Sequence, residues 1–186
     1  MLTTLVSKVQ EYTENPDPLA NAAGTIAIVV AVNQPFYPLY LHVIVGAAAW
    51  PAWLTLLSTP FFLMVPVIAR RNSLLGRAML PIAGVANTVL CVKLFGVASA
   101  VELFLLPCVL LGAILFRPRE RATMVLVLTV PFAAYLGLDW NLGPPMKVFS
   151  SSTYNSIIAV HAVSVAALTA LVGLLFARSR REVGRN

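Results

Sequence analysis

Charge is scarce in this sequence. Lysine, arginine, aspartate and glutamate together make up 11% of the 186 residues, whereas a soluble domain has about 25%. Hydrophobic residues make up 59%, and the mean hydropathy is +0.86. This balance excludes an ordinary soluble domain and predicts an integral membrane protein that resides in a lipid bilayer.

Cysteine and histidine are also rare, with two of each in the whole chain. Cys91 and Cys108 both lie in apolar runs, which favours small buried residues over a disulfide framework. Neither an HExxH nor a GxSxG motif occurs, and no nucleophile stands beside a base in the sequence. We therefore expect a protein that is not an enzyme.

Long apolar runs dominate the chain. Each is near the ~20 residues that cross ~30 Å of hydrocarbon as a helix. They cover residues 24–48, 51–69, 78–97, 99–116, 122–140 and 155–177. The pattern predicts an all-α integral membrane protein with six transmembrane helices in one bundle.

The runs divide the chain into three parts. Residues 24–177 are predicted to form the six-helix transmembrane domain. Residues 1–23 precede it and are predicted to form an amphipathic segment, whose short helix ends before Pro16. Residues 178–186 follow it as a basic tail.

Arginine gives the runs a direction. All ten arginines follow the second, fourth and sixth runs, within 70–77, 117–121 and 178–185. Because cytoplasmic loops carry an excess of lysine and arginine, these segments and both termini are predicted to be cytoplasmic, in a multi-pass protein of the inner membrane. The same asymmetry explains the formal net charge of +6, so no nucleic acid is expected as a partner.

Polar residues inside the runs predict a site. Lys93 and Glu102 flank the turn 95–99 and are expected to form an ion pair. His42 and His161 each lie about six residues from the outer end of a run, or roughly 9 Å. Ionisable residues at one depth in a membrane bundle indicate a functional site. The predicted ligand-binding residues are His42, Asn87, Lys93, Glu102, Asp139 and His161.

Several kinds of site remain open for these residues. One is an outer-half pocket for a small molecule or ion in a receptor, where binding shifts the helix packing. Another is a one-haem b-type protein with His42 and His161 as the axial ligands. A divalent metal site of His161, Glu102 and Asp139 would suit zinc or manganese. A packing subunit of a larger membrane complex is the remaining alternative.

The segment PVIARRNSLLGRAMLPIAGVANTVLCVKLFGVASAVELFLLPCVLLGAILFRPRER, residues 66–121, carries its polar signals in a characteristic order. A basic turn with glycine precedes Asn87, a turn with Gly96, then Glu102, an aromatic residue, a proline and an arginine-rich stop. It resembles the six-helix membrane domain of class III adenylate cyclases and related bacterial sensors. The opening VQEYTENPDPLANAAG…PFYPLY, within residues 9–40, is similar to the membrane sensors of quorum-sensing-type histidine kinases.

The resemblance implies a non-catalytic sensor module that forms a homodimer. In those families the sixth helix continues into an output domain, whereas this sequence closes with LLFARSRREVGRN. We therefore expect an isolated receptor module or one that acts through a membrane-protein partner. The resemblance implies no particular ligand, because the outer turn reads GVASAVE without the histidine or additional acid often found there in the family.

Overall fold

The computed structural model describes the backbone of residues 2–183, and the side chains of residues 7–138 and 142–177. Every element in this part of the chain is helical. The expected N-terminal helix is present as α1, and the expected basic tail lies outside the described side chains.

The helices follow one another with short connections. In chain order they are α1 (Leu2–Thr13), α2 (Pro18–Asn33), α3 (Phe36–Val45), η1 (Gly46–Ser58), α4 (Thr59–Arg71), α5 (Ser73–Phe95), η2 (Val97–Ser99), η3 (Val101–Phe104), α6 (Leu105–Ile114), η4 (Pro118–Glu120), α7 (Arg121–Asn141) and α8 (Ser151–Val183). The η elements are 3₁₀ helices.

Local chemistry sets the ends of these helices. Asp17 accepts a hydrogen bond from the Leu19 amide and so caps α2, while Asn72 caps α5 through the Leu75 amide. These side chains satisfy amides that the first helical turn leaves without a partner. Gly96 ends α5 with a φ of 76°, a conformation that side chains other than glycine rarely adopt.

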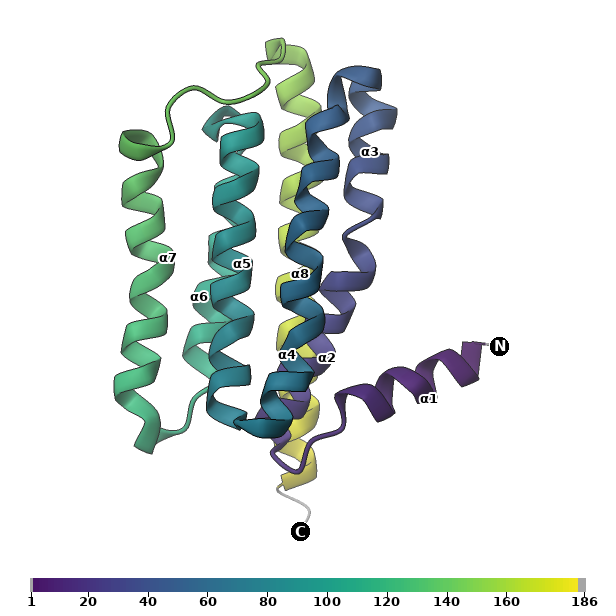
Figure 1. The fold of residues 1–186 in the computed structure, drawn as a ribbon, viewed down its shortest axis with the longest axis vertical. Helices are drawn as coiled ribbons and strands as arrows, with labels where there is room; N and C mark the ends of the chain where they lie inside the picture. The colour runs from purple at the N-terminus through teal and green to yellow at the C-terminus, as the bar shows by residue number, and fades with distance from the viewer. Residues whose placement is uncertain (1, 184–186) are drawn as a thin grey trace.

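Helix α5 lies at the centre of the bundle (Figure 1). It contacts α2, α4, α6 and α7, whereas α8 contacts α2, α3, α6 and the short helices η2 and η3. Helix α1 extends sideways from the bundle. It leaves at the end where α4 turns into α5 and α6 connects to α7, which we call the arginine end because residues 70–77 and 117–121 lie there.

Four helical segments are long and apolar enough to cross a membrane. They are Pro18–Arg71, Ser73–Phe95, Pro118–Leu138 and Ser151–Ala177, and Val101–Ile114 is a shorter apolar helix. This supports a membrane protein with an all-helical fold.

The first segment, 54 residues long, folds back on itself. Helix α2 packs against α4, and α3 packs against η1, so the chain reverses within Gly46–Ser58. The number of crossings and the side on which the termini lie stay predictions, which are argued below.

Candidate functional site

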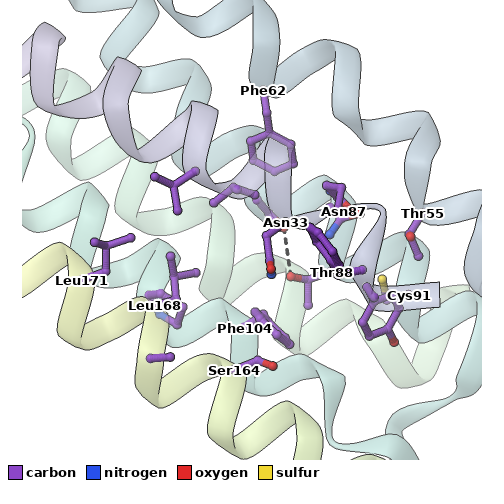
Figure 2. Close-up of a pocket in the computed structure, with 18 of the residues that line it drawn as sticks. Asn33, Thr55, Phe62, Asn87, Thr88, Cys91, Phe104, Ser164, Leu168 and Leu171 are labelled. Atoms are coloured by element: carbon purple, nitrogen blue, oxygen red, sulfur yellow. Dashed lines mark hydrogen bonds between the residues drawn. The ribbon is translucent and has the colours of Figure 1, made fainter. Parts of the chain in front are cut away.

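A cavity of about 1210 Å³ lies between α2, α3, α5, α6 and α8. Most of its wall is apolar, with Phe62 and Phe104 on two sides and Leu168 and Leu171 on α8, as Figure 2 shows. This volume is above the ~300–1,000 Å³ of ordinary ligand pockets. The cavity is therefore large enough to hold a small organic molecule.

The polar part of the wall is uncharged. It consists of amides, hydroxyls and thiols, among them Asn33, Gln34, Thr55, Asn87, Thr88, Cys91 and Ser164. No lysine, arginine, aspartate or glutamate is among the described residues that line the cavity. A charged ligand would lose its hydration here without gaining a partner of opposite charge, so the lining favours a neutral one.

One hydrogen-bonded group joins three elements beside the cavity. Gln34 Nε2 donates to Ser58 Oγ at 2.6 Å, and Ser58 Oγ lies 2.8 Å from both Asn87 Oδ1 and Thr55 O. Ser58 has one hydroxyl proton and therefore donates to one of these two oxygens at a time. Because Asn87 faces the group with its oxygen, its amide nitrogen is available to a molecule in the cavity.

The cavity opens sideways along α2 and α8. Side chains on its rim are exposed, with 60% for Val32, 49% for Tyr40 and 70% for Val163. In a bilayer such apolar rims face hydrocarbon rather than water. An apolar molecule dissolved in the membrane has direct access to the cavity.

His161 of α8 lies behind the cavity wall and is fully buried, with 0% exposure. Its Nδ1 is 2.7 Å from the Ser99 carbonyl oxygen, and its Nε2 is 3.0 Å from the Tyr37 hydroxyl. The ring stacks on Tyr37 and meets Phe104 edge to face. Both of those aromatic residues line the cavity, whereas His161 does not.

The structure brings few of the sequence-predicted residues to this cavity. Asn87 lines it, and His161 touches it through two neighbours. His42 is exposed on α3, and Glu102 is half-buried on η3; neither lines the cavity. The side chain of Asp139 lies outside the described residues.

Lys93 has a structural partner that the sequence did not indicate. Its Nζ donates to the carbonyl oxygens of Leu142 and Pro144 at 2.8 and 2.9 Å. The expected pair with Glu102 is not among the ion pairs of the described residues, which all lie at the arginine end. Lys93 therefore fixes the connection between α7 and α8 to the end of α5.

The two histidines do not form a haem site in this arrangement. An axial ligand needs a ring nitrogen that is free to bind iron. Both nitrogens of His161 are hydrogen-bonded inside the fold, and His42 is on an exposed face. Among the described side chains, no group of three histidine, cysteine, aspartate or glutamate residues is placed to hold a metal ion.

Sequence reasoning missed most of the polar lining. Gln34, Thr55, Ser58 and Thr88 belong to three different elements and form no spacing motif along the chain. The available signal was weak: each is an uncharged polar residue within or beside an apolar run. Asn87 was found because Gly84, Asn87 and Cys91 share one face of α5, and the structure confirms this, since all three line the cavity.

A second cluster lies at the arginine end and joins α2, α5 and η4. Arg77 is 1% exposed and donates to both carboxylate oxygens of Glu120, at 2.7 and 2.8 Å. Arg117 donates to Asp17 Oδ1 at 2.7 Å, and the Ser73 hydroxyl donates to Asp17 Oδ2. The sequence indicated these arginines only as markers of orientation.

Asp17 is held as a carboxylate by this cluster. Burial alone would raise its pKa. Hydrogen bonds from Ser73 and the Leu19 amide, together with the charges of Arg77 and Arg117, lower the pKa of Asp17 below its ordinary value. All charged groups of the cluster have partners, which is what a buried ionic network requires. We interpret this cluster as structural and the cavity as the candidate functional site.

No protein-family model, curated protein or solved structure matches this chain, so its function has to be inferred from its own residues.

Proposed function

We propose that this chain is a non-catalytic receptor-like membrane module that binds a neutral, mostly apolar small molecule in the cavity. The observation that carries the proposal is the cavity itself, of about 1210 Å³, apolar and bordered by uncharged hydrogen-bonding groups. Binding would favour one packing of the helices over another, which is how a ligand without catalysis produces a signal.

The membrane topology that fits this role has six crossings. Helices α2 and α3 would form the first, η1 and α4 the second, and α5 the third. The short helices η3 and α6 would form the fourth, α7 the fifth and α8 the sixth. The concentration of arginine within 70–77 and 117–121 favours a cytoplasmic arginine end, with both termini in the cytoplasm of a cell whose inner membrane holds the protein.

The chemistry of the ligand follows from the wall. Asn87 and Thr88 offer an amide and a hydroxyl, and the aromatic and aliphatic residues offer a large apolar surface. A ligand with one neutral polar group and an apolar remainder would satisfy both parts. The sideways opening supports arrival through the bilayer.

A partner would pass the signal on. The resemblance to six-helix sensor domains supports a homodimer or a separate membrane-protein partner. The outward face of α8 supports close contact between helices, because Ala162, Ala166, Ala170 and Gly173 are all exposed there. Small residues at such spacing allow two helices in lipid to approach closely.

The test is to identify what the cavity retains. The full chain is purified in bilayer discs without added ligand, and its organic extract is analysed by mass spectrometry. Leu168→Trp would fill the cavity, whereas Leu174→Trp places the same side chain on α8 at a position that is 65% exposed. We expect one non-lipid compound at about one per chain in the wild type and in Leu174→Trp.

In Leu168→Trp we expect that compound to fall by roughly tenfold, which corresponds to ~1.4 kcal/mol of binding free energy. Circular dichroism and gel filtration of the three proteins show whether the fold is kept. Equal extracts from Leu168→Trp and Leu174→Trp, with both proteins folded, would show that the cavity is not a binding site.

A further inference from the structure

Three segments meet at the imidazole of His161. The Ser99 carbonyl, in the turn between α5 and η3, only accepts hydrogen bonds, so the His161 Nδ1 atom at 2.7 Å carries a proton. In a neutral ring the other nitrogen is then an acceptor, and the Tyr37 hydroxyl at 3.0 Å donates to it. The hydrogen bonds run from α3 through α8 to the outer turn and fix one tautomer.

The same imidazole also touches the cavity wall on two sides. Its centroid is 5.7 Å from that of Tyr37, with the rings 20° from parallel, and 5.8 Å from that of Phe104, with the rings at 77°. Tyr37 and Phe104 line the cavity. A molecule that shifts either ring therefore changes the contacts of a residue that is itself shielded from the cavity.

Helix α8 depends on this residue for its attachment. In the part of α8 that the structure describes, two side chains form hydrogen bonds to other segments: His161, and Tyr154, whose hydroxyl donates to the Phe95 carbonyl at 3.0 Å. Only 22% of the apolar window of α8 is buried, against 56% for α5. A helix with so little packing is readily displaced when one of its two polar attachments changes.

We infer that His161 is a positioning residue that couples occupancy of the cavity to the position of α8, through its hydrogen bond from Tyr37 and its contact with Phe104. This rests on the proposed function, because it assigns a regulatory role to the wall of the same cavity. An occupied cavity holds Tyr37 in a different position from an empty one. The hydrogen bond to His161 Nε2, and with it the attachment of α8 to α3, changes accordingly.

Nitrogen-15 NMR of the full chain in bilayers tests this inference without a known ligand. The chain contains two histidines, so labelled histidine gives few signals, and His42→Gln assigns them. We expect His161 to be protonated at Nδ1, with an Nε2 signal that is displaced by hydrogen bonding. Tyr37→Phe, which removes the donor and keeps the ring, should shift the His161 Nε2 signal and leave His42 unchanged.

Tyr154→Phe is the matched control, since it removes the other tyrosine hydroxyl bond of α8, whose acceptor is a backbone carbonyl. We expect it to leave the His161 signals in place. Filling the cavity with Leu168→Trp, about 10 Å of helix away from His161, should shift the His161 Nε2 signal, whereas Leu174→Trp should not. If Leu168→Trp does not fold, Leu171→Trp fills the cavity from the same helix.

The outcomes separate this inference from the proposed function. Loss of the extracted compound in Leu168→Trp with unchanged His161 signals would overturn the coupling and leave the binding site intact. A His161 protonated only at Nε2 would also overturn it. His161 signals that respond to Leu168→Trp, while no protein yields a compound on extraction, would support the coupling and count against the proposed function.

Discussion

Arg77 shows what a charged side chain requires inside this bundle. Its Nε lies 3.2 Å from the Ser73 carbonyl and hydroxyl oxygens, and Nη1 donates to Leu115 O and Glu120. Nη2 donates to the other oxygen of Glu120. A planar guanidinium can satisfy partners in several directions at once, which a lysine ammonium cannot do at these positions.

Replacing Arg77 should therefore be costly. In Arg77→Met the carboxylates of Glu120 and Asp17 lose a buried cation, and we expect the free energy of unfolding to fall by about 3–5 kcal/mol. The measurement is the unfolding midpoint of the purified protein in a detergent titration, with Arg119→Met as the control at an exposed position. Similar midpoints for the two variants would show that the network contributes little.

Single residues were also where sequence reasoning was weakest. The runs predicted that Arg77 lies at a membrane boundary, but its partner Glu120 is 43 positions away and no spacing rule joins them. Lys93 and Glu102 are close in sequence, which suggested a pair. The structure instead turns Lys93 toward the carbonyls of Leu142 and Pro144.

At the level of single helices, hydrophobicity predicted existence better than extent. Runs 78–97 and 122–140 correspond to α5 and α7, because each is apolar and has caps at its start or end. Run 24–48 is divided into α2 and α3 at Gln34 and Pro35, since proline lacks the amide that continues a helix. Run 51–69 begins as the 3₁₀ helix η1, which no hydrophobic average distinguishes from an α-helix.

The contact between α4 and α5 depends on one glycine. A Cβ on Gly76 would lie 2.5 Å from Ala69 Cα and 2.7 Å from Ala69 N, which are backbone atoms that cannot rotate away. Gly76→Ala must therefore separate the two helices, and we expect a loss of about 3 kcal/mol, at the upper end for overpacking.

Gly173 provides the matched comparison for this prediction. It lies in α8 with nothing within 4 Å of the added Cβ, so Gly173→Ala should leave the unfolding midpoint unchanged or raise it slightly. The midpoints of both variants are measured in the same detergent. A Gly76→Ala midpoint equal to that of Gly173→Ala would show that α4 and α5 are less closely packed than the structure indicates.

The arrangement of the whole molecule was beyond the sequence. Apolar runs and arginine positions predict how many helices there are and which way each points, but they do not predict which helices are neighbours. The cavity exists because α8 packs beside α2, α3 and η3. This places Ser164 opposite Asn33 and Asn87 (Figure 2), and no local pattern in those segments specifies the pairing.

The central claim of this account is a six-crossing bundle with the cavity inside the membrane and both termini in the cytoplasm. Its most direct test is labelling of single-cysteine variants with a membrane-impermeant thiol reagent, in intact and permeabilised cells. The native Cys91 and Cys108 are buried, at 3% and 5% exposure, and should give little background.

We expect Ala47→Cys, Ala98→Cys and Met146→Cys to react in intact cells, because these exposed positions lie at the end opposite the arginines. Arg71→Cys and Arg119→Cys should react only after permeabilisation. Labelling of Arg71→Cys in intact cells, with Ala47→Cys protected, would mean that Pro18–Arg71 does not cross the membrane twice, and would contradict the account.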